Sequence, residues 1–135
     1  MFDLNKFIGQ YVTKRPQSMF LNDIENNKEE LTEKIRGKSV LVIGGAGSIG
    51  SSFIKAILPF KPATLSIVDY NENALAELTR DLRSTKGMFV PKDYIPYPMD
   101  FSSPVFEKMF RSRSGFDIVG NFSAHKHVRS EKDIY

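Results

Sequence analysis

Three regularly spaced glycines are the residues of this chain that point most directly to chemistry. They are Gly44, Gly47 and Gly50, and they follow the apolar run Ser39–Ile43. Because glycine has no Cβ, a turn rich in glycine lets the backbone come close to a phosphate group at the start of a helix. We predict that Gly44 permits a sharp turn, Gly47 admits a pyrophosphate, and Gly50 lets a helix and a sheet pack closely.

The residues after this turn complete the predicted phosphate site. A helix that begins near Ser48 would direct the amides of Ser48 and Ile49 toward the phosphate oxygens. Gly50 is followed by Ser51 and Ser52, and because the lysine of a P-loop is missing we expect no site of that kind. A methyltransferase-type nucleotide site remains an alternative, since it also combines a glycine turn with an acidic residue after the second strand.

An acidic residue is expected at the end of the next strand. Asp69 lies where a carboxylate that accepts hydrogen bonds from an adenosine ribose is expected, about 20 residues after the last glycine. Such a carboxylate repels a 2′-phosphate, and Tyr70 rather than arginine follows it, although Arg80 or Lys86 could offset this repulsion. Asn71 is assigned to the same site and can also cap the next helix. We therefore predict NAD or NADP as the cofactor and favour NAD.

Two further groups of residues are expected at the same edge of the sheet. Asp100 follows the third strand and could accept a hydrogen bond from an adenine amino group beside the Phe101 amide; an Asx turn explains it equally well. Ser123 and Ala124 are small residues at the end of the fourth strand, where they suit close passage of a cofactor. Lys126 could bind a phosphate or a sugar of the substrate, and an exposed, solvated lysine is an equal alternative.

Alternating strands and helices must position these residues. The predicted strands cover about residues 39–43, 64–68, 94–99 and 116–122, and the predicted helices cover about 23–36 and 48–58 and then follow the caps Asn71 and Ser103. This order predicts an α/β fold, namely a Rossmann-like parallel sheet of strand order 3-2-1-4 with flanking helices, incomplete and preceded by an N-terminal arm and helix. Pro96 and Pro98 should make the third strand short and place it at an edge.

We accordingly assign residues 1–37 to the N-terminal arm and helix, and residues 38–135 to the N-terminal part of an NAD(P)-binding domain.

Composition excludes several other classes of protein. The 19 basic residues are interspersed with 16 acidic ones, and a net charge of +3 without a basic stripe argues against a nucleic-acid partner. Cysteine is absent, so disulfides and thiol catalysis are excluded. His125 and His127 are the two histidines, and without a third ligand we expect no metal site. No apolar run approaches the roughly 18 residues of a membrane span, and a secretory signal is lacking, so we expect a soluble cytoplasmic protein.

Three segments of the sequence resemble a known family. Val42–Ser51 resembles its V-T-G-A-G-G-S-I-G-S motif, Val68–Glu72 resembles D-x-S-E, and Ala124–Val128 resembles A-A-A-x-K-H-V. On these motifs the chain resembles the N-terminal part of an extended short-chain dehydrogenase/reductase. More narrowly, it is similar to nucleotide-sugar 4,6-dehydratases of bacterial polysaccharide biosynthesis, including UDP-N-acetylglucosamine 4,6-dehydratases. It departs from them at Ile43, where the family has threonine, and at Asn121, where it has histidine.

The resemblance implies a reaction. In the family, NAD(P) takes a hydride from C4 of a nucleotide-linked sugar, water leaves across C5–C6, and the hydride returns to C6. The acid and base residues of the family follow the fourth strand, and no Tyr-x-x-x-Lys motif occurs in these 135 residues. We therefore expect the front part of a longer lyase, with no catalytic residue here and little turnover of its own.

Other functions and the state of assembly stay open at this point. A non-catalytic dinucleotide-binding or regulatory module is the main alternative, and a nucleic-acid binder is a weaker one. An unpaired fourth strand would invite pairing with another chain, so we expect a homo-oligomer.

Overall fold

The computed structural model describes residues 21–123 of the chain. The chain divides into two compact units, Met1–Lys34 and Ile35–Tyr135. The predicted domains, residues 1–37 and 38–135, stay a prediction.

Two helices take the place of the single helix predicted over about residues 23–36. Helix α2 spans Leu21–Asn26 and helix α3 spans Lys28–Ile35. Between them, the Asn27 backbone amide and side chain both donate to the Asp23 carbonyl oxygen, at 3.1 and 2.8 Å. The prediction of one continuous helix is therefore wrong, and the first of the two helices starts earlier than predicted, at Leu21.

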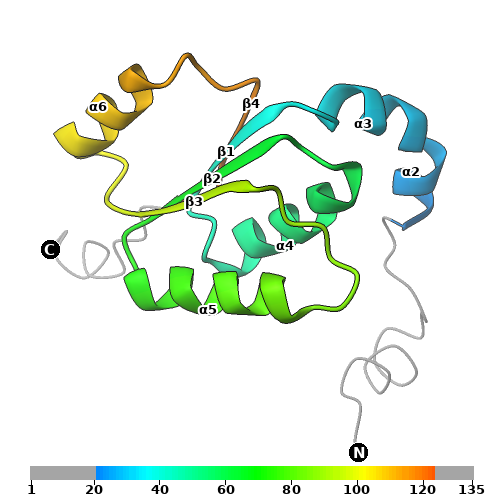
Figure 1. Cartoon of the computed structure of the whole chain (residues 1–135), viewed down its shortest axis with the longest axis horizontal. Coiled ribbons are helices and arrows are strands. Elements are labelled where there is room, and N and C mark those ends of the chain that lie inside the picture. Colours follow the sequence, from blue (N-terminus) through cyan, green and yellow to red (C-terminus); the bar gives the residue numbers. More distant parts are fainter. Residues whose placement is uncertain (1–20, 124–135) are drawn as a thin grey trace, which may run out of the picture. The chain divides into compact units, whose positions relative to one another are not determined.

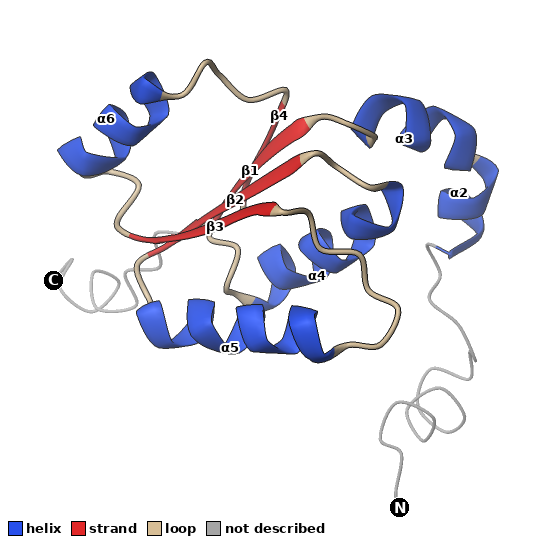
Figure 2. Cartoon of the chain, in the orientation of Figure 1, coloured by secondary structure: helices blue, strands red, loops and turns tan. Residues whose placement is uncertain are grey.

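The second unit is built on one parallel sheet (Figure 2). Its strands are β1 (Ser39–Ile43), β2 (Thr64–Asp69), β3 (Asp93–Pro98) and β4 (Ile118–Asn121). Their order is β3-β2-β1-β4, and each neighbouring pair is parallel. The predicted α/β class, Rossmann-like topology and strand order are thus confirmed.

Helices cover both faces of this sheet. They are α4 (Ser48–Ile57), which continues into the short 3₁₀ helix η2 (Leu58–Phe60), α5 (Glu72–Ser84) and α6 (Pro104–Ser112). Figure 1 shows α4 and α5 on one face of the sheet and α6 on the other. This arrangement explains why β1 and β2 read as continuous apolar runs, because strands covered on both faces need apolar side chains on both.

The core lies around the two central strands. On the α6 face, Leu41, Ile43 and Val68 form a buried cluster with Met109. On the other face, Val40, Val42, Leu65 and Ile67 are fully buried, as is Ile54 of α4. Burial of each such aliphatic side chain stabilises the folded state by about 1.5–3 kcal/mol. The carboxyl ends of β1 and β2 are therefore held in fixed positions relative to each other.

The edge strand β3 bears out one part of its prediction and corrects another. It lies at an edge, as its prolines indicated, but it is as long as β2 and pairs with it from Asp93 to Pro98. The Met99 amide donates to the Asp69 carbonyl oxygen at 3.1 Å. Because residues of one parity along a strand face the same neighbour, Pro96 and Pro98 face away from β2, where no donor is needed.

Strand β4 is shorter than the predicted 116–122. Asp117 precedes it, and its carboxylate accepts a hydrogen bond from the Ser39 amide at 2.9 Å, so this residue fixes the start of β1 against the start of β4. Along the described residues, no helix has the length and apolarity needed to cross a membrane.

Candidate functional site

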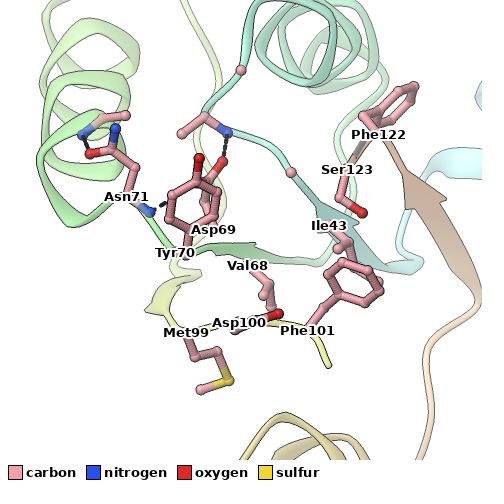
Figure 3. A pocket seen from close by; sticks show the side chains of 14 residues that line it. Ile43, Val68, Asp69, Tyr70, Asn71, Met99, Asp100, Phe101, Phe122 and Ser123 are labelled. Carbon is pink, nitrogen blue, oxygen red and sulfur yellow. Dashed lines mark hydrogen bonds between the residues drawn. The ribbon is translucent and has the colours of Figure 1, made fainter. Parts of the chain in front are cut away.

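A cavity of about 480 Å³ lies at the carboxyl ends of the strands (Figure 3). Its lining comes from the ends of β1 and β2 and from the residues that follow β1, β2, β3 and β4. It consists of Ile43, Gly44, Ala46, Gly47, Val68, Asp69, Tyr70, Asn71, Ala74, Met99, Asp100, Phe101, Phe122 and Ser123. This is the edge at which open α/β sheets bind ligands. Seven of the predicted site residues are among those that line it: Gly44, Gly47, Asp69, Asn71, Asp100, Phe101 and Ser123.

Two glycines of the turn are required by the fold itself. Gly44 has φ +73°, and a Cβ there would lie 2.7 Å from the backbone nitrogen of Ser123. A Cβ on Gly50 would overlap the Gly44 carbonyl oxygen and lie 2.8 Å from the Gly45 Cα. Backbone atoms cannot swing aside as flexible side chains can, so these positions exclude any larger residue.

Gly47 differs, because nothing in the described part of the chain requires glycine there. Its φ of −74° and ψ of 172° are open to any residue. A Cβ would meet a single group within 4 Å, the Gly44 carbonyl oxygen at 3.5 Å, which is an ordinary contact. Gly47 also lines the cavity. Glycine at this position therefore leaves open space in the cavity and is not required by packing.

The same residue leaves the start of α4 without a side-chain cap. Helices α5 and α6 are capped by Asn71 and Ser103, whose side-chain oxygens accept backbone hydrogen bonds, whereas Gly47 offers none to α4. The Ser51 amide donates to the Gly47 carbonyl oxygen at 2.9 Å, and the amides of Ser48 and Ile49 precede this bond. The helix dipole adds roughly half a positive charge at this end.

Three of the predicted residues lie beside the cavity rather than in its lining. Ser48, Ile49 and Gly50 form the first turn of α4, and the Ile49 side chain is 70% exposed.

Asp69 lines the cavity, and both of its carboxylate oxygens accept backbone hydrogen bonds. One carboxylate oxygen, Oδ2, accepts a hydrogen bond from the Ala46 amide at 3.1 Å, and the other, Oδ1, accepts from the Asn71 amide at 3.0 Å (Figure 3). The carboxylate thereby joins the end of β2 to the glycine turn. Asn71 accepts a hydrogen bond from the Ala74 amide at 3.0 Å, which confirms its predicted cap.

The remaining predicted residues have structural partners of their own. Asp100 accepts from the Ser102 amide at 2.9 Å and from its hydroxyl at 2.8 Å, so the Asx turn is present and the adenine contact stays a prediction. Ser123 donates from both its amide and its hydroxyl to the Asn121 side-chain oxygen. Ala124 and Lys126 lie outside the described residues, as do His125 and His127.

Sequence reasoning left Tyr70 out of the site. Its side chain is 84% exposed, and it lines the cavity beside Asp69 (Figure 3). The available signal was its place directly after the acidic residue that ends β2.

The charged residues of the lining are Asp69 and Asp100, and no lysine or arginine of the described chain joins them. Within residues 21–123, no group of three acidic or histidine side chains is placed to hold a metal ion.

Comparison with known proteins places the chain among relatives. Residues 40–133 match the family model described as polysaccharide biosynthesis protein. The chain belongs to this family. The probable polysaccharide biosynthesis protein EpsC of Bacillus subtilis is 30% identical over 73% of the chain. The capsular polysaccharide biosynthesis protein CapD of Staphylococcus aureus is 25% identical over 78% of the chain. An uncharacterized membrane protein of Methanocaldococcus jannaschii is 41% identical over 43% of the chain.

The match covers only part of these relatives. The chain spans 16–17% of the length of the curated proteins it matches. Among solved structures, Pen from Bacillus thuringiensis has a TM-score of 0.57 at 26% identity over 70% of this chain and 27% of its own. An epimerase of Methanothermobacter thermautotrophicus has a TM-score of 0.56 at 21% identity over 87% of this chain and 32% of its own, which shows a shared fold.

Proposed function

We propose that the cavity binds a nicotinamide dinucleotide, with NAD preferred over NADP. We further propose that the chain is the cofactor-binding front part of an enzyme that modifies a nucleotide-linked sugar in polysaccharide biosynthesis, namely a 4,6-dehydratase or an epimerase acting on a UDP-sugar. The observation that carries the proposal is Gly47, whose missing side chain leaves space at the uncapped start of α4 that the described chain does not fill.

Each part of the lining suits one part of such a ligand. The amides of Ser48 and Ile49, together with the dipole of α4, would hold the pyrophosphate. Asp69 keeps further lone pairs on its carboxylate oxygens, and these can accept from the ribose hydroxyls. The exposed Tyr70 ring offers a face on which a purine can stack.

The charges around the cavity favour NAD. A 2′-phosphate beside Asp69 would meet a like charge. Arg80, which could offset this repulsion, is paired with Glu77 at 2.8 Å, and neither Arg80 nor Lys86 lines the cavity.

The sugar-modifying role draws on the family to which the chain belongs. A bound nicotinamide would supply reversible hydride transfer with a sugar carbon. The described residues would bind and orient the adenosine and pyrophosphate end, and we assign no catalytic residue to them. The substrate contact predicted for Lys126 stays a prediction, as do the homo-oligomeric state and the cytoplasmic location.

Isothermal titration of the purified chain with NAD and NADP tests the proposal. We expect one site per chain and tighter binding of NAD. A folded sample that releases no heat with either dinucleotide, and whose melting temperature neither raises, would refute the proposal.

A non-catalytic dinucleotide-binding module is the second candidate, because the 135 residues contain no Tyr-x-x-x-Lys motif. The reading frame downstream of residue 135 separates the two, because the acid and base residues of the enzyme would be encoded there. A downstream Tyr-x-x-x-Lys or lysine–aspartate set favours the enzyme, and a stop codon directly after residue 135 favours the module.

A further inference from the structure

We infer that Asp69 is a positioning residue for the phosphate end of the site, in addition to any contact that it makes with a ribose. Its carboxylate holds the glycine turn in its binding conformation through the Ala46 amide. This inference rests on the proposed dinucleotide site, because it concerns how that site is kept in shape.

The hydrogen bonds of the turn show why one carboxylate matters. Gly44 is tied to β2 through its amide, which donates to the Val68 carbonyl oxygen at 2.7 Å. Beyond Gly44, the bond from the Ala46 amide to Asp69 is the one described hydrogen bond between the turn and β2. The Gly47 amide reaches back to the Gly44 carbonyl oxygen at a longer 3.3 Å. Gly45 is also packed against Ile67 and Ile54. Without Asp69, however, no described hydrogen bond would join the backbone from Gly45 to Gly47 to β2.

The two oxygens of Asp69 have separate tasks. Oδ2 accepts from Ala46 in the turn after β1, and Oδ1 accepts from Asn71 in the turn after β2. One carboxylate thus sets the position of the phosphate-binding turn relative to the start of α5. Asparagine has a single side-chain acceptor oxygen, so Asp69→Asn cannot supply a separate oxygen to each amide.

The positioning role and simple electrostatics predict opposite changes in pyrophosphate affinity when the charge of Asp69 is removed. A carboxylate near a bound pyrophosphate repels it, so removing the charge alone should tighten pyrophosphate binding. If Asp69 positions the turn, the same substitution should weaken pyrophosphate binding, although inorganic pyrophosphate has no ribose with which Asp69 could interact. We expect a loss of about tenfold, the factor that corresponds to the upper end of the range for one hydrogen bond.

Two measurements test the inference on the 135-residue chain. The first is amide hydrogen exchange without ligand, comparing the wild type with Asp69→Asn and Asp69→Ala. We expect the Ala46 amide to exchange about tenfold faster in Asp69→Ala, while the Gly44 amide, bonded to β2, keeps its rate. The second is titration with inorganic pyrophosphate and NAD. For pyrophosphate, which has no adenine, Asp100→Asn is the matched control, because it removes one charge from the same cavity and leaves the acceptor of Ala46 in place.

The outcomes separate the inference from the proposed function. Faster exchange at Ala46, with weaker pyrophosphate binding in the Asp69 variants than in Asp100→Asn, supports the positioning role. Unchanged exchange at Ala46 in both variants overturns it, as does pyrophosphate binding that is unchanged or tighter. If the wild type binds neither pyrophosphate nor NAD, the proposed function fails and the positioning role with it, whatever the exchange rates show.

Discussion

Replacement of Gly47 by alanine should weaken dinucleotide binding while leaving the fold intact. The added methyl group would project from a residue that lines the cavity, and it would meet one described atom within 4 Å, the Gly44 carbonyl oxygen at 3.5 Å. Gly50→Ala is the matched comparison from the same motif. Its methyl group would overlap the Gly44 carbonyl oxygen and press on the Gly45 Cα.

The size of each effect follows from these contacts. For Gly47→Ala, the lower entropy of the unfolded chain stabilises by about 0.4–1 kcal/mol, and the poorer helix start costs a similar amount, so the net change should be near zero. For Gly50→Ala, overpacking against backbone costs about 1–3 kcal/mol or more, which lowers the melting temperature of a domain of this size by roughly 4–20 °C. A methyl group forced against a bound pyrophosphate by Gly47→Ala should cost a similar 1–3 kcal/mol, or about a 5- to 150-fold loss of affinity for NAD.

Thermal unfolding and calorimetric titration with NAD measure the two quantities separately. Gly47→Ala should melt within a few degrees of the wild type and bind NAD weakly, whereas Gly50→Ala should melt at a clearly lower temperature. A Gly47→Ala variant that binds NAD as tightly as the wild type, or that destabilises the fold as much as Gly50→Ala does, would contradict this assignment of Gly47.

Three further predictions concern the surroundings of the site. Tyr70→Ala should lower NAD affinity about fivefold or more by loss of stacking. Because Tyr70 is 84% exposed, the melting temperature of the protein should not change, and Tyr70→Phe should bind NAD normally in the same titration. Asn71→Ala should remove the cap of α5 and lower the melting temperature by about 4–8 °C, whereas Asn71→Asp should retain the cap. Burial raises the pKa of Tyr94 above its ordinary 10.0, so the stability contributed by its neutral hydroxyl is present below that pH and is lost as the pH rises through the folded-state pKa. Tyr94→Phe should lose the 2.8 Å bond to Thr79, and its unfolding free energy should fall less steeply above pH 10 in denaturant titrations.

The fold was largely predictable because its signals are local and agree with one another. The apolar runs before Gly44 and Asp69, with caps at Asn71 and Ser103, determine the element order, and right-handed crossovers then determine the sheet order. The errors arose where tertiary contacts outweigh local pattern. Asp117 fits a strand pattern, but its side chain is used to bind the start of β1.

Seven of the cavity-lining residues were predictable from the sequence, but the hydrogen bonds of the candidate site were not. Residue spacing predicted that Gly44, Asp69 and Asp100 would lie at one edge of the sheet, because the carboxyl ends of parallel strands share that edge. Spacing could not show that the Asp69 carboxylate is already bonded to Ala46, since that depends on the path of the turn. The exposed Tyr70 was missed for a related reason, because exposure at a cavity is a property of the fold and not of the motif.

The glycine motif combines two physical requirements that a pattern of letters does not distinguish. Gly44 and Gly50 are needed to bring the turn, the start of α4 and the chain after β4 together, so any protein with this tight turn would need them, whether or not it binds a nucleotide. Gly47 is needed by neither the backbone conformation nor the packing of the described chain. A nucleotide ligand is therefore indicated by Gly47 and by the Asp69 carboxylate that bonds to the same turn. Substitution at Gly47 consequently tests function, whereas substitution at Gly44 or Gly50 tests folding.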